Sequence, residues 1–380
     1  MKKKLIRTAT VATSLDILLK GQLSFLNKYY QVIAVSGHDP HLEKVCEREK
    51  VKTIAVTFQR HISPFKDLVS LIQLYKVFKV EKPHIVHSIT PKAGLISMIA
   101  SYFAGVPVRI HTFTGLVFPS KNGLMKQLLL NMDRVLCLFA THIYPEGAGV
   151  KQDLISYKIT KKPLKVIANG NINGIDTAFF DPNLYSETEI QQLKLQLKID
   201  ANDFVFVFVG RLVKDKGINE LVVAFEILQR EKFNIKLLLV GDFENNLDPL
   251  FPQTMDSINN NKSIISVGFQ QDVRSFFAIS DVLTFPSYRE GFPNVVMQAG
   301  AMNLPCIVTD INGCNEIITN KINGLIIPIK NIQALFDAMK KTIDNEKLFQ
   351  KMNDNARLLI LFRYEQNVVW DALLKEYDKK

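Results

Sequence analysis

The sequence predicts an α/β protein made of two doubly wound domains that face each other across a cleft. Short apolar runs alternate with helical patterns in both halves, which is typical of parallel sheets covered on both faces. A chain of 380 residues is too long for one ordinary hydrophobic core. The composition, 47% hydrophobic and 22% charged, is that of a globular protein. Together these observations favour two Rossmann-like domains.

Six apolar runs of the front half have the length and composition of buried strands. They are Leu5–Thr10, Gln31–Ser36, Thr53–Val56, His84–Ser88, Val108–Thr112 and Thr141–Tyr144. Helical periodicity is clearest between them in Phe65–Val80 and Lys92–Ala104. The helix at 65–80 carries an apolar stripe of Phe65, Leu68, Ile72 and Tyr75. We expect this stripe to dock on the sheet, and a helix on a bilayer surface is the alternative.

Residues 163–182 interrupt this alternation with Asn-Gly and Asn-x-Gly steps followed by Asp181-Pro182. The predicted domains are therefore 1–175 and 176–362, with a closing helix at 363–380. A second series of strands follows at Phe204–Val209, Lys236–Val240, Ile264–Val267, Val282–Phe285, Pro305–Val308 and Gly324–Ile327. Its predicted helices are Asn219–Arg230, Asp272–Ala278, Pro293–Met302 and Ile332–Asp344, and an amphipathic helix, Tyr364–Lys380, ends the chain.

Charge is unevenly distributed along the chain. Residues 1–180 hold 25 Lys and Arg against 11 Asp and Glu, whereas residues 181–380 hold 22 against 26. A basic front half suits an anionic membrane surface or a phosphorylated acceptor. We expect no nucleic-acid partner, because no basic run is interleaved with aromatic residues.

The four cysteines have neither metal-ligand nor redox spacing and are expected to be reduced cytosolic thiols. No signal peptide is expected, because Arg7 and Asp16 interrupt the first apolar stretch. The segment Leu124–Ile143 contains three charged residues, which disfavours a spanning helix. We therefore expect a cytoplasmic protein, with any membrane contact peripheral.

Two cations follow the strand at 204–209, namely Arg211 and Lys216, between Gly210 and Gly217. In an open α/β sheet, ligands bind at the carboxyl ends of the strands. A guanidinium and an ammonium at that edge can neutralise a diphosphate; the alternative is an exposed basic turn. Since the chain has no Asp-x-Asp pair, we expect a site without a metal or other cofactor that relies on these cations and on a helix dipole.

The segment 286–298 follows another strand of the same half. Glu290 is expected to accept hydrogen bonds from sugar hydroxyls, or else to cap a helix. Pro293 suits the first turn of that helix, and the amides around it would face an anion. Gln298 lies one turn beyond Asn294 on the same helix face, and we expect it to reach a ribose. The expected donor-binding residues of this segment are Gly291, Phe292, Pro293, Asn294, Val295 and Gln298.

Three further places are candidates for ligand contacts. Gly268 and Phe269 end a strand and would offer main chain to a base, or form a plain tight turn. In the front half, Lys20 and Gly21 would face an acceptor phosphate, or begin a solvated helix. His111 ends a strand and would face the cleft, with a structural histidine as the alternative. The loop after the first strand lacks Gly-x-Gly-x-x-Gly, which counts against a dinucleotide dehydrogenase.

These motifs resemble the retaining glycosyltransferases of family 4, which have the GT-B fold. The resemblance covers nearly the whole chain and rests on Gly-Arg-Leu-x-x-x-Lys-Gly at 210–217, Pro-Ser-x-x-Glu-Gly-Phe-Pro at 286–293, Gly-x-x-Glu at 313–316, the Asn-Gly linker at 169–174 and the closing segment 363–370. The segments at 19–22 and 110–116 are similar to bacterial members that build capsular and other surface polysaccharides.

The resemblance implies that Arg211 and Lys216 bind the donor diphosphate and that Glu290 contacts the transferred sugar. It also implies a UDP-sugar donor, of the N-acetylated hexosamine type, and an acceptor sugar on a polyprenyl diphosphate at the inner face of the cell membrane. Two positions depart from the family pattern. Gln298 stands where the family has a second glutamate, and Thr114 stands where many members have a histidine before the glycine that is Gly115 here.

Two other functions are compatible with the same motifs. A UDP-sugar 2-epimerase of similar architecture would change the donor without an acceptor. A non-catalytic protein that binds anionic membranes would tolerate the departure at Gln298, although the residues around Glu290 argue against it.

Overall fold

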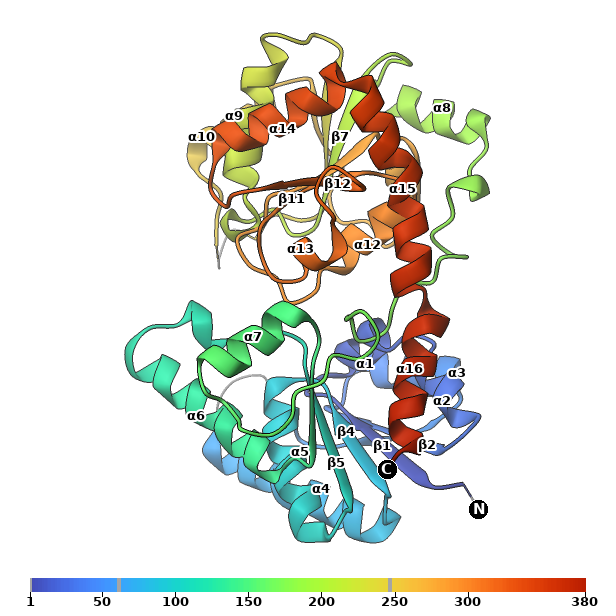
Figure 1. Ribbon diagram of the computed structural model, residues 1–380, viewed down its shortest axis with the longest axis vertical. Helices are drawn as coiled ribbons and strands as arrows, with labels where there is room; N and C mark the ends of the chain where they lie inside the picture. The colour runs from blue at the N-terminus through green and yellow to red at the C-terminus, as the bar shows by residue number, and fades with distance from the viewer. Residues whose placement is uncertain (1, 60–62, 245–247) are drawn as a thin grey trace. The chain divides into compact units, whose positions relative to one another are not determined.

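A computed structural model describes residues 2–59, 63–244 and 248–380. The chain divides into two compact units: unit 1 comprises Met1–Gly174 and Gln366–Lys380, and unit 2 comprises Ile175–Glu365. Within the described residues, each unit contains one six-stranded parallel sheet with helices on both faces (Figure 1). The predicted class, two doubly wound α/β domains, is confirmed.

Unit 1 is built on a sheet of order β3-β2-β1-β4-β5-β6. Its strands are β1 (Lys4–Thr8), β2 (Gln31–Ser36), β3 (Lys52–Ala55), β4 (Ile85–Ser88), β5 (Val108–Phe113) and β6 (His142–Pro145). Its helices are α1 (Ala12–Leu18), α2 (Gln22–Asn27), α3 (Pro40–Glu49), α4 (Pro64–Glu81), α5 (Pro91–Ala104), the 3-10 turn η1 (Phe118–Ser120), α6 (Gly123–Phe139), α7 (Ala148–Ser156) and α16 (Gln366–Asp378).

The two faces of this sheet bury separate hydrophobic clusters. Helices α1, α2, α3 and α16 cover one face, and α4, α5 and α6 cover the other (Figure 1). Alternating side chains of β1 explain this division, since Leu5 belongs to the first cluster and Ile6 to the second. Helix α16 is part of this core through Leu373 and Tyr377.

Unit 2 repeats the same plan in the order β12-β11-β10-β7-β8-β9. Its strands are β7 (Phe204–Val209), β8 (Ile235–Val240), β9 (Ile264–Ser266), β10 (Val282–Phe285), β11 (Cys306–Thr309) and β12 (Gly324–Ile327). Its helices are the 3-10 turn η2 (Pro182–Leu184), α8 (Glu187–Gln196), the 3-10 turn η3 (Lys214–Lys216), α9 (Ile218–Gln229), α10 (Pro252–Asn260), α11 (Arg274–Ala278), α12 (Asn294–Ala301), α13 (Cys314–Ile317), α14 (Ile332–Asp344) and α15 (Glu346–Tyr364).

In both units the strand order reverses beside the first strand. The reversal lies between β1 and β4 in unit 1 and between β7 and β10 in unit 2. At such a switch point the two loops that leave the carboxyl ends diverge to opposite faces and leave a crevice for a ligand. The fold therefore places one candidate binding edge in each unit.

Helix α4 does not dock through the stripe predicted from the sequence. Its buried residues are Ser70, Leu74 and Phe78. The predicted stripe faces solvent, with Phe65 87% exposed and Leu68 54% exposed. The prediction was wrong because the apolar residues of this helix are spread around its circumference, so that periodicity alone does not identify the packed face.

Candidate active site

Two loops of unit 2 meet at its switch point. The first follows β7 and contains residues 210–217, and the second follows β10 and contains residues 286–293. Strands β7 and β10 are hydrogen-bonded neighbours, with Phe206 opposite Val282. Because both strands are parallel, both loops leave the same edge of the sheet.

The loops are joined by an ion pair between Lys216 and Glu290. The Lys216 ammonium contacts Oε1 of Glu290, and both side chains are 16% exposed. Ser287 donates a hydrogen bond of 2.8 Å to the same carboxylate oxygen. The carbonyl of Ser287 in turn accepts a hydrogen bond from the Thr309 hydroxyl at the end of β11. Glu290 is therefore held by two donors from separate loops.

Glycine allows this close approach. Gly217 has φ of +72°, and a Cβ atom there would lie 2.2 Å from the carbonyl oxygen of Pro286. A backbone hydrogen bond of 2.8 Å from Tyr288 to the carbonyl of Asp215 also connects the loops. No side chain fits between the two backbones at this position, so a glycine is required.

Arg211 stands at the other end of the first loop. Its guanidinium pairs with Glu244, and its side chain is 56% exposed. Gly210, just before it, has φ of +149°, and its carbonyl oxygen lies 1.9 Å from where a Cβ of Gly241 would be. The loops after β7 and β8 are therefore in backbone contact, and the half-exposed Arg211 side chain extends from that contact to its partner Glu244.

Helix α12 begins one residue later than the sequence predicted. Pro293 is the N-cap, with φ of −73° and ψ of 110°, and the first helical residue is Asn294. An extended ψ at Pro293 explains the shift. Asn294 and Gln298 are both partly exposed on this helix. The ring of Phe292 is buried and packs against Tyr364 at a centroid distance of 5.6 Å, so its backbone is the part left for a ligand.

Gly291 and the start of α12 are further positioned by the loop after β11. A Cβ at Gly313, where φ is +75°, would lie 2.5 Å from the carbonyl oxygen of Gly291. The amide of Gly313 donates to the Glu316 carboxylate at 3.3 Å. Glu316 thus shapes the loop that supports Gly291.

The predicted base-binding turn differs from the expectation in detail. The amide of Phe269 donates a 3.0 Å hydrogen bond to the Asp242 carboxylate, and the Gly268 carbonyl accepts one of 2.9 Å from Gly241. These main-chain groups already have partners. The ring of Phe269, however, is 70% exposed and offers an apolar face to a ligand.

In unit 1, Lys20 and Gly21 lie beside the closing helix α16. A Cβ at Gly21, where φ is +82°, would lie 2.8 Å from the Trp370 ring. The Lys20 carbonyl accepts a 3.0 Å hydrogen bond from the Asn173 amide group. Gly21 therefore makes room for the indole, while the side chain of Lys20 is exposed.

The structure places His111 inside unit 1 and not at an open edge. Its ring is 1% exposed, lies 2.8 Å from the Ser88 hydroxyl and packs edge-on against Phe113. Burial lowers the pKa of His111 to about 3, so the ring is neutral. Gly94 of α5 explains the burial, since a Cβ there would be 2.5 Å from the imidazole. Thr114 is half-buried, and its hydroxyl donates to the carbonyl of Ile89 at 3.1 Å.

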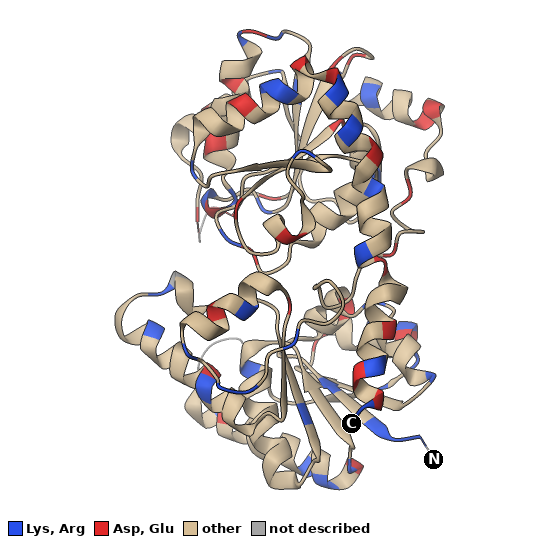
Figure 2. Ribbon diagram, in the orientation of Figure 1, with Lys and Arg blue, Asp and Glu red and all other residues tan. Residues whose placement is uncertain are grey.

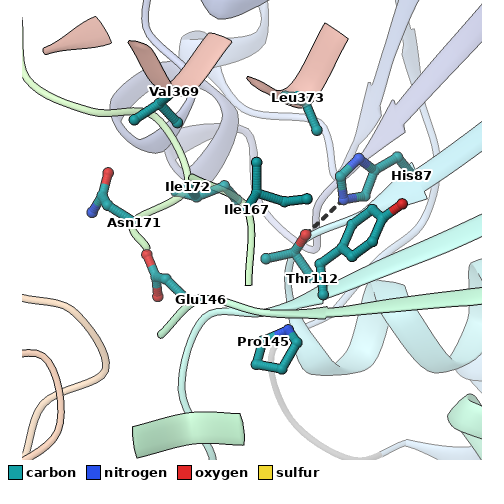
Figure 3. Close-up of a pocket in the computed structure, with 10 residues that line it drawn as sticks. His87, Thr112, Pro145, Glu146, Ile167, Asn171, Ile172, Val369 and Leu373 are labelled. Atoms are coloured by element: carbon teal, nitrogen blue, oxygen red, sulfur yellow. Dashed lines mark hydrogen bonds between the residues drawn. The ribbon is translucent and has the colours of Figure 1, made fainter. Parts of the chain in front are cut away.

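A second buried histidine lies near the carboxyl edge of the same sheet. His87 hydrogen-bonds the Thr112 hydroxyl at 2.7 Å beside a cavity of about 20 Å³ (Figure 3). That volume suits a single water molecule. Burial, followed by the charge of Arg7, holds the pKa of His87 well below its usual value. Neither histidine is positioned as a general base for a bulky substrate.

The arrangement in unit 2 offers positive charge, a fixed carboxylate and a helix start at one sheet edge. Such a set can bind a diphosphate through Lys216, Arg211 and the first amides of α12, and sugar hydroxyls through Glu290. Sequence reasoning missed the roles of Ser287 and Glu244. The Ser287 hydroxyl lies within the quoted motif, but nothing in the pattern indicates its direction.

Two features are absent from the described ranges 2–59, 63–244 and 248–380. In this part of the chain, no group of three or more His, Cys, Asp or Glu side chains is placed to hold a metal ion. Likewise, no helix described there combines the length and apolar character needed to cross a bilayer.

Comparison with known proteins identifies the class, that of glycosyltransferases with the GT-B fold. Family models match residues 10–144, described as glycosyl transferase 4-like, and residues 189–359, described as glycosyl transferases group 1. The chain therefore belongs to glycosyltransferase family 4. As a member of that family it is an enzyme, which favours sugar transfer over the epimerase and the non-catalytic alternatives.

Individual relatives match most or nearly all of the chain. The chain is 30% identical over 385 residues to the capsular polysaccharide biosynthesis glycosyltransferase CapM of Staphylococcus aureus, covering 99% of this chain and 97% of the relative. It is 30% identical over 303 residues to an Escherichia coli UDP-Gal:alpha-D-GlcNAc-diphosphoundecaprenol alpha-1,3-galactosyltransferase, covering 79% and 76%. The structure of Anabaena HepE with UDP and glucose superposes with a TM-score of 0.81 over all of both chains at 17% identity, which shows the fold.

Proposed function

We propose that the protein is a retaining glycosyltransferase of capsular or surface polysaccharide synthesis. It transfers a sugar from a UDP-sugar to a saccharide carried on polyprenyl diphosphate. The observation that carries this proposal is the Lys216–Glu290 contact at the switch point between β7 and β10. The relatives support the donor and acceptor classes, since the E. coli enzyme is named for UDP-Gal and a diphosphoundecaprenol-linked sugar.

In the proposed reaction, the bond between the anomeric carbon and the β-phosphate oxygen breaks. Lys216, Arg211 and the first amides of α12 stabilise the negative charge that develops on UDP. The acceptor hydroxyl forms its new bond on the same face of the sugar, and its proton passes to the departing phosphate oxygen. Glu290 holds the sugar hydroxyls and keeps the Lys216 ammonium in place. Gln298 hydrogen-bonds the ribose through its neutral amide.

The direct test is a transfer assay with purified protein. A panel of UDP-glucose, UDP-galactose, UDP-GlcNAc and UDP-GalNAc is incubated with undecaprenyl-diphosphate-linked GlcNAc. We expect one donor to give a disaccharide product whose anomeric configuration, measured by NMR, matches that of the donor. An inverted product would overturn the retaining mechanism, and an isomerised donor without product would establish the epimerase instead.

Donor binding by itself gives a second prediction. UDP at about a hundred times its Kd should stabilise the protein by about 2.7 kcal/mol and raise its Tm by about 5–10 °C. We expect the same shift in EDTA, because the proposed site neutralises the diphosphate with side chains. Thermal unfolding with UDP, GDP and ADP measures the preference; a larger shift with GDP, or loss of the UDP shift in EDTA, would contradict the proposed donor site.

Unit 1 presents surfaces suited to a membrane. It holds 28 Lys and Arg against 13 Asp and Glu, whereas unit 2 holds 19 against 24 (Figure 2). Helix α4 exposes Phe65, and helix α6 exposes Leu124 by 90%. Lys66 and Lys126 are the next basic residues on these helices. Apolar side chains beside basic ones favour the surface of an anionic bilayer, which supports peripheral attachment at the cytoplasmic face.

Vesicle binding tests this attachment with a matched control. The double variant Phe65→Ser/Leu124→Ser should bind phosphatidylglycerol-containing vesicles about tenfold more weakly, because each change removes buried apolar contact with the bilayer. The control Leu195→Ser/Phe233→Ser changes equally exposed residues of unit 2, 79% and 84%, and should bind like wild type. Co-sedimentation measures both; equal losses in the two variants would show that α4 and α6 are not the attachment surface.

A further inference from the structure

A large cavity of unit 1 lies at the switch point of its sheet. Its volume is about 400 Å³, within the range of small-molecule sites. It is bounded by the loops that follow β1, β4 and β5 and by one side of α6. The lining residues that matter for its chemistry are Val11, Leu95, Leu129, Met132 and Asp133.

Most of this lining is hydrocarbon, and two of its three hydroxyls, those of Thr10 and Thr90, are engaged with each other, whereas Ser14 supplies a third hydroxyl. Thr10 and Thr90 hydrogen-bond each other at 2.8 Å, and the Thr10 hydroxyl also accepts from the amide of Ala93 at 3.1 Å. Lys92, also in the lining, pairs with Asp67 of α4 at 2.6 Å. A sugar ring would need several hydrogen bonds, more than Ser14 and the engaged Thr10, Thr90 and Lys92 are placed to supply.

Asp133 is the exception in the lining. It is 9% exposed, and across the described parts of the chain it has no hydrogen-bond or ion-pair partner. Burial raises the pKa of Asp133 to about 7. The titratable groups nearby do not offset this: Lys92 is paired with Asp67, burial raises the pKa of Cys137 to about 12, and His111 is neutral. An unpaired carboxyl in hydrocarbon is costly unless it is protonated.

An apolar stripe on α6 adjoins the cavity lining. Met125, Leu128, Leu129 and Met132 occupy positions i, i+3, i+4 and i+7, which lie on one helix face. Leu129 and Met132 line the cavity, while Met125 and Leu128 are 46% and 47% exposed. An aliphatic path therefore leads from the surface into the cavity.

We propose that this cavity holds the first isoprene units of the lipid-linked acceptor, with the rest of the chain leaving along α6. The inference rests on the proposed function and names the subsite for the lipid. An aliphatic chain matches the walls and excludes water from Asp133, so the bound state contains the neutral carboxyl. Ionised Asp133 opposes binding.

Farnesyl diphosphate, a water-soluble isoprenoid, tests the cavity without any transfer reaction. Calorimetry should show binding to wild type and at least tenfold weaker binding to Met132→Trp, whose indole fills the cavity. Leu138→Trp is the matched control, on the same helix but outside the lining and 70% exposed. Thermal unfolding verifies that each variant is folded. The proposal would be overturned if both variants bound farnesyl diphosphate with equal affinity. It would also be overturned if wild type bound inorganic diphosphate as tightly as farnesyl diphosphate.

The pH dependence separates Asp133 from the ligand's own titration. Above pH 7, the affinity of wild type for farnesyl diphosphate, divided by that of Asp133→Asn, should fall by about tenfold per pH unit. The reason is that the Asp133 carboxyl must take up a proton on binding. The ligand's phosphate titrates identically in both measurements and cancels. Parallel pH profiles would show that Asp133 does not contact the isoprenoid.

The outcome is distinguishable from failure of the proposed function. Suppose that wild type binds farnesyl diphosphate, that Met132→Trp does not, and that wild type transfers no sugar. This result would retain the lipid subsite and reject the transferase proposal. Transfer that proceeds with an unchanged KM for the undecaprenyl acceptor in Met132→Trp would reject the subsite alone. If Met132→Trp raised the KM for an ethyl-diphosphate-linked acceptor as much as the KM for the undecaprenyl acceptor, the cavity would hold the saccharide. That result would also overturn the lipid assignment.

Discussion

Replacing Lys216 with methionine is expected to lower kcat/KM for sugar transfer by about 10²–10³-fold, the usual loss when one donor to a developing anion is removed. Methionine keeps most of the apolar stem of the side chain but removes the ammonium. The change also leaves Glu290 with Ser287 as the donor described above, so the carboxylate loses its opposite charge. Loss of charge stabilisation on UDP and misplacement of Glu290 act in the same direction.

The matched control is Lys214→Met in the same 3-10 turn. Lys214 is exposed, and its ammonium lies 5.0 Å from the centre of the Phe251 ring, away from Glu290. We expect near wild-type kinetics for this variant. Arg211→Ala should behave like Lys216→Met, with a smaller effect because the Arg211 side chain is 56% exposed. Steady-state rates and UDP-induced thermal shifts measure both effects. Wild-type kcat/KM in Lys216→Met would remove this lysine from the diphosphate site.

The strands were predictable because each is a short apolar run whose ends are marked by turn residues. β7, β10 and β12 begin and end where the sequence predicted. Helix α6 was not predicted, although its residues have helical periodicity, because the segment was considered only as a candidate membrane span.

The active-site candidates of unit 2 were predictable for a topological reason. Lys216 and Glu290 follow neighbouring parallel strands, so the order of the sheet brings them to one edge. The partners that orient them depend on loop geometry, which periodicity does not report; Glu244 beside Arg211 is an example.

Unit 1 was harder to predict because contacts distant in sequence decide the environment of its candidates. His111 was expected at a strand end, but β5 continues to Phe113, and Gly94 of α5 leaves room for the ring beneath that helix. Gly21 leaves room for the Trp370 ring of α16, which comes from the other end of the chain. Asp133 was noted only as a charge that disfavours a spanning helix. Its position in an apolar cavity is visible only once α5 and α6 are packed.

Replacing Gly217 with alanine is expected to reduce both stability and activity, since this glycine sets the distance between the two active-site loops. Left-handed backbone costs an alanine about 1–2 kcal/mol. A Cβ 2.2 Å from the Pro286 carbonyl adds a clash that the backbone must relieve by moving, at about 1–3 kcal/mol. Because Pro286 precedes Ser287 and Glu290, that movement separates Glu290 from Lys216. A displacement near 1 Å at such a site lowers turnover by about 10²-fold.

Gly268→Ala is the control that measures the cost of left-handed backbone without a steric clash. Gly268 lies in the same unit with φ of +69°, and a Cβ there would meet its nearest atom at 3.9 Å. Its free energy of unfolding should fall only by the cost of alanine in left-handed backbone, about 1–2 kcal/mol. Denaturant unfolding of both variants gives the difference, which measures the clash between the loops. If Gly217→Ala were no less stable than Gly268→Ala and retained full kcat/KM, the loops would tolerate separation, and the contact between Lys216 and Glu290 would not be what positions the donor.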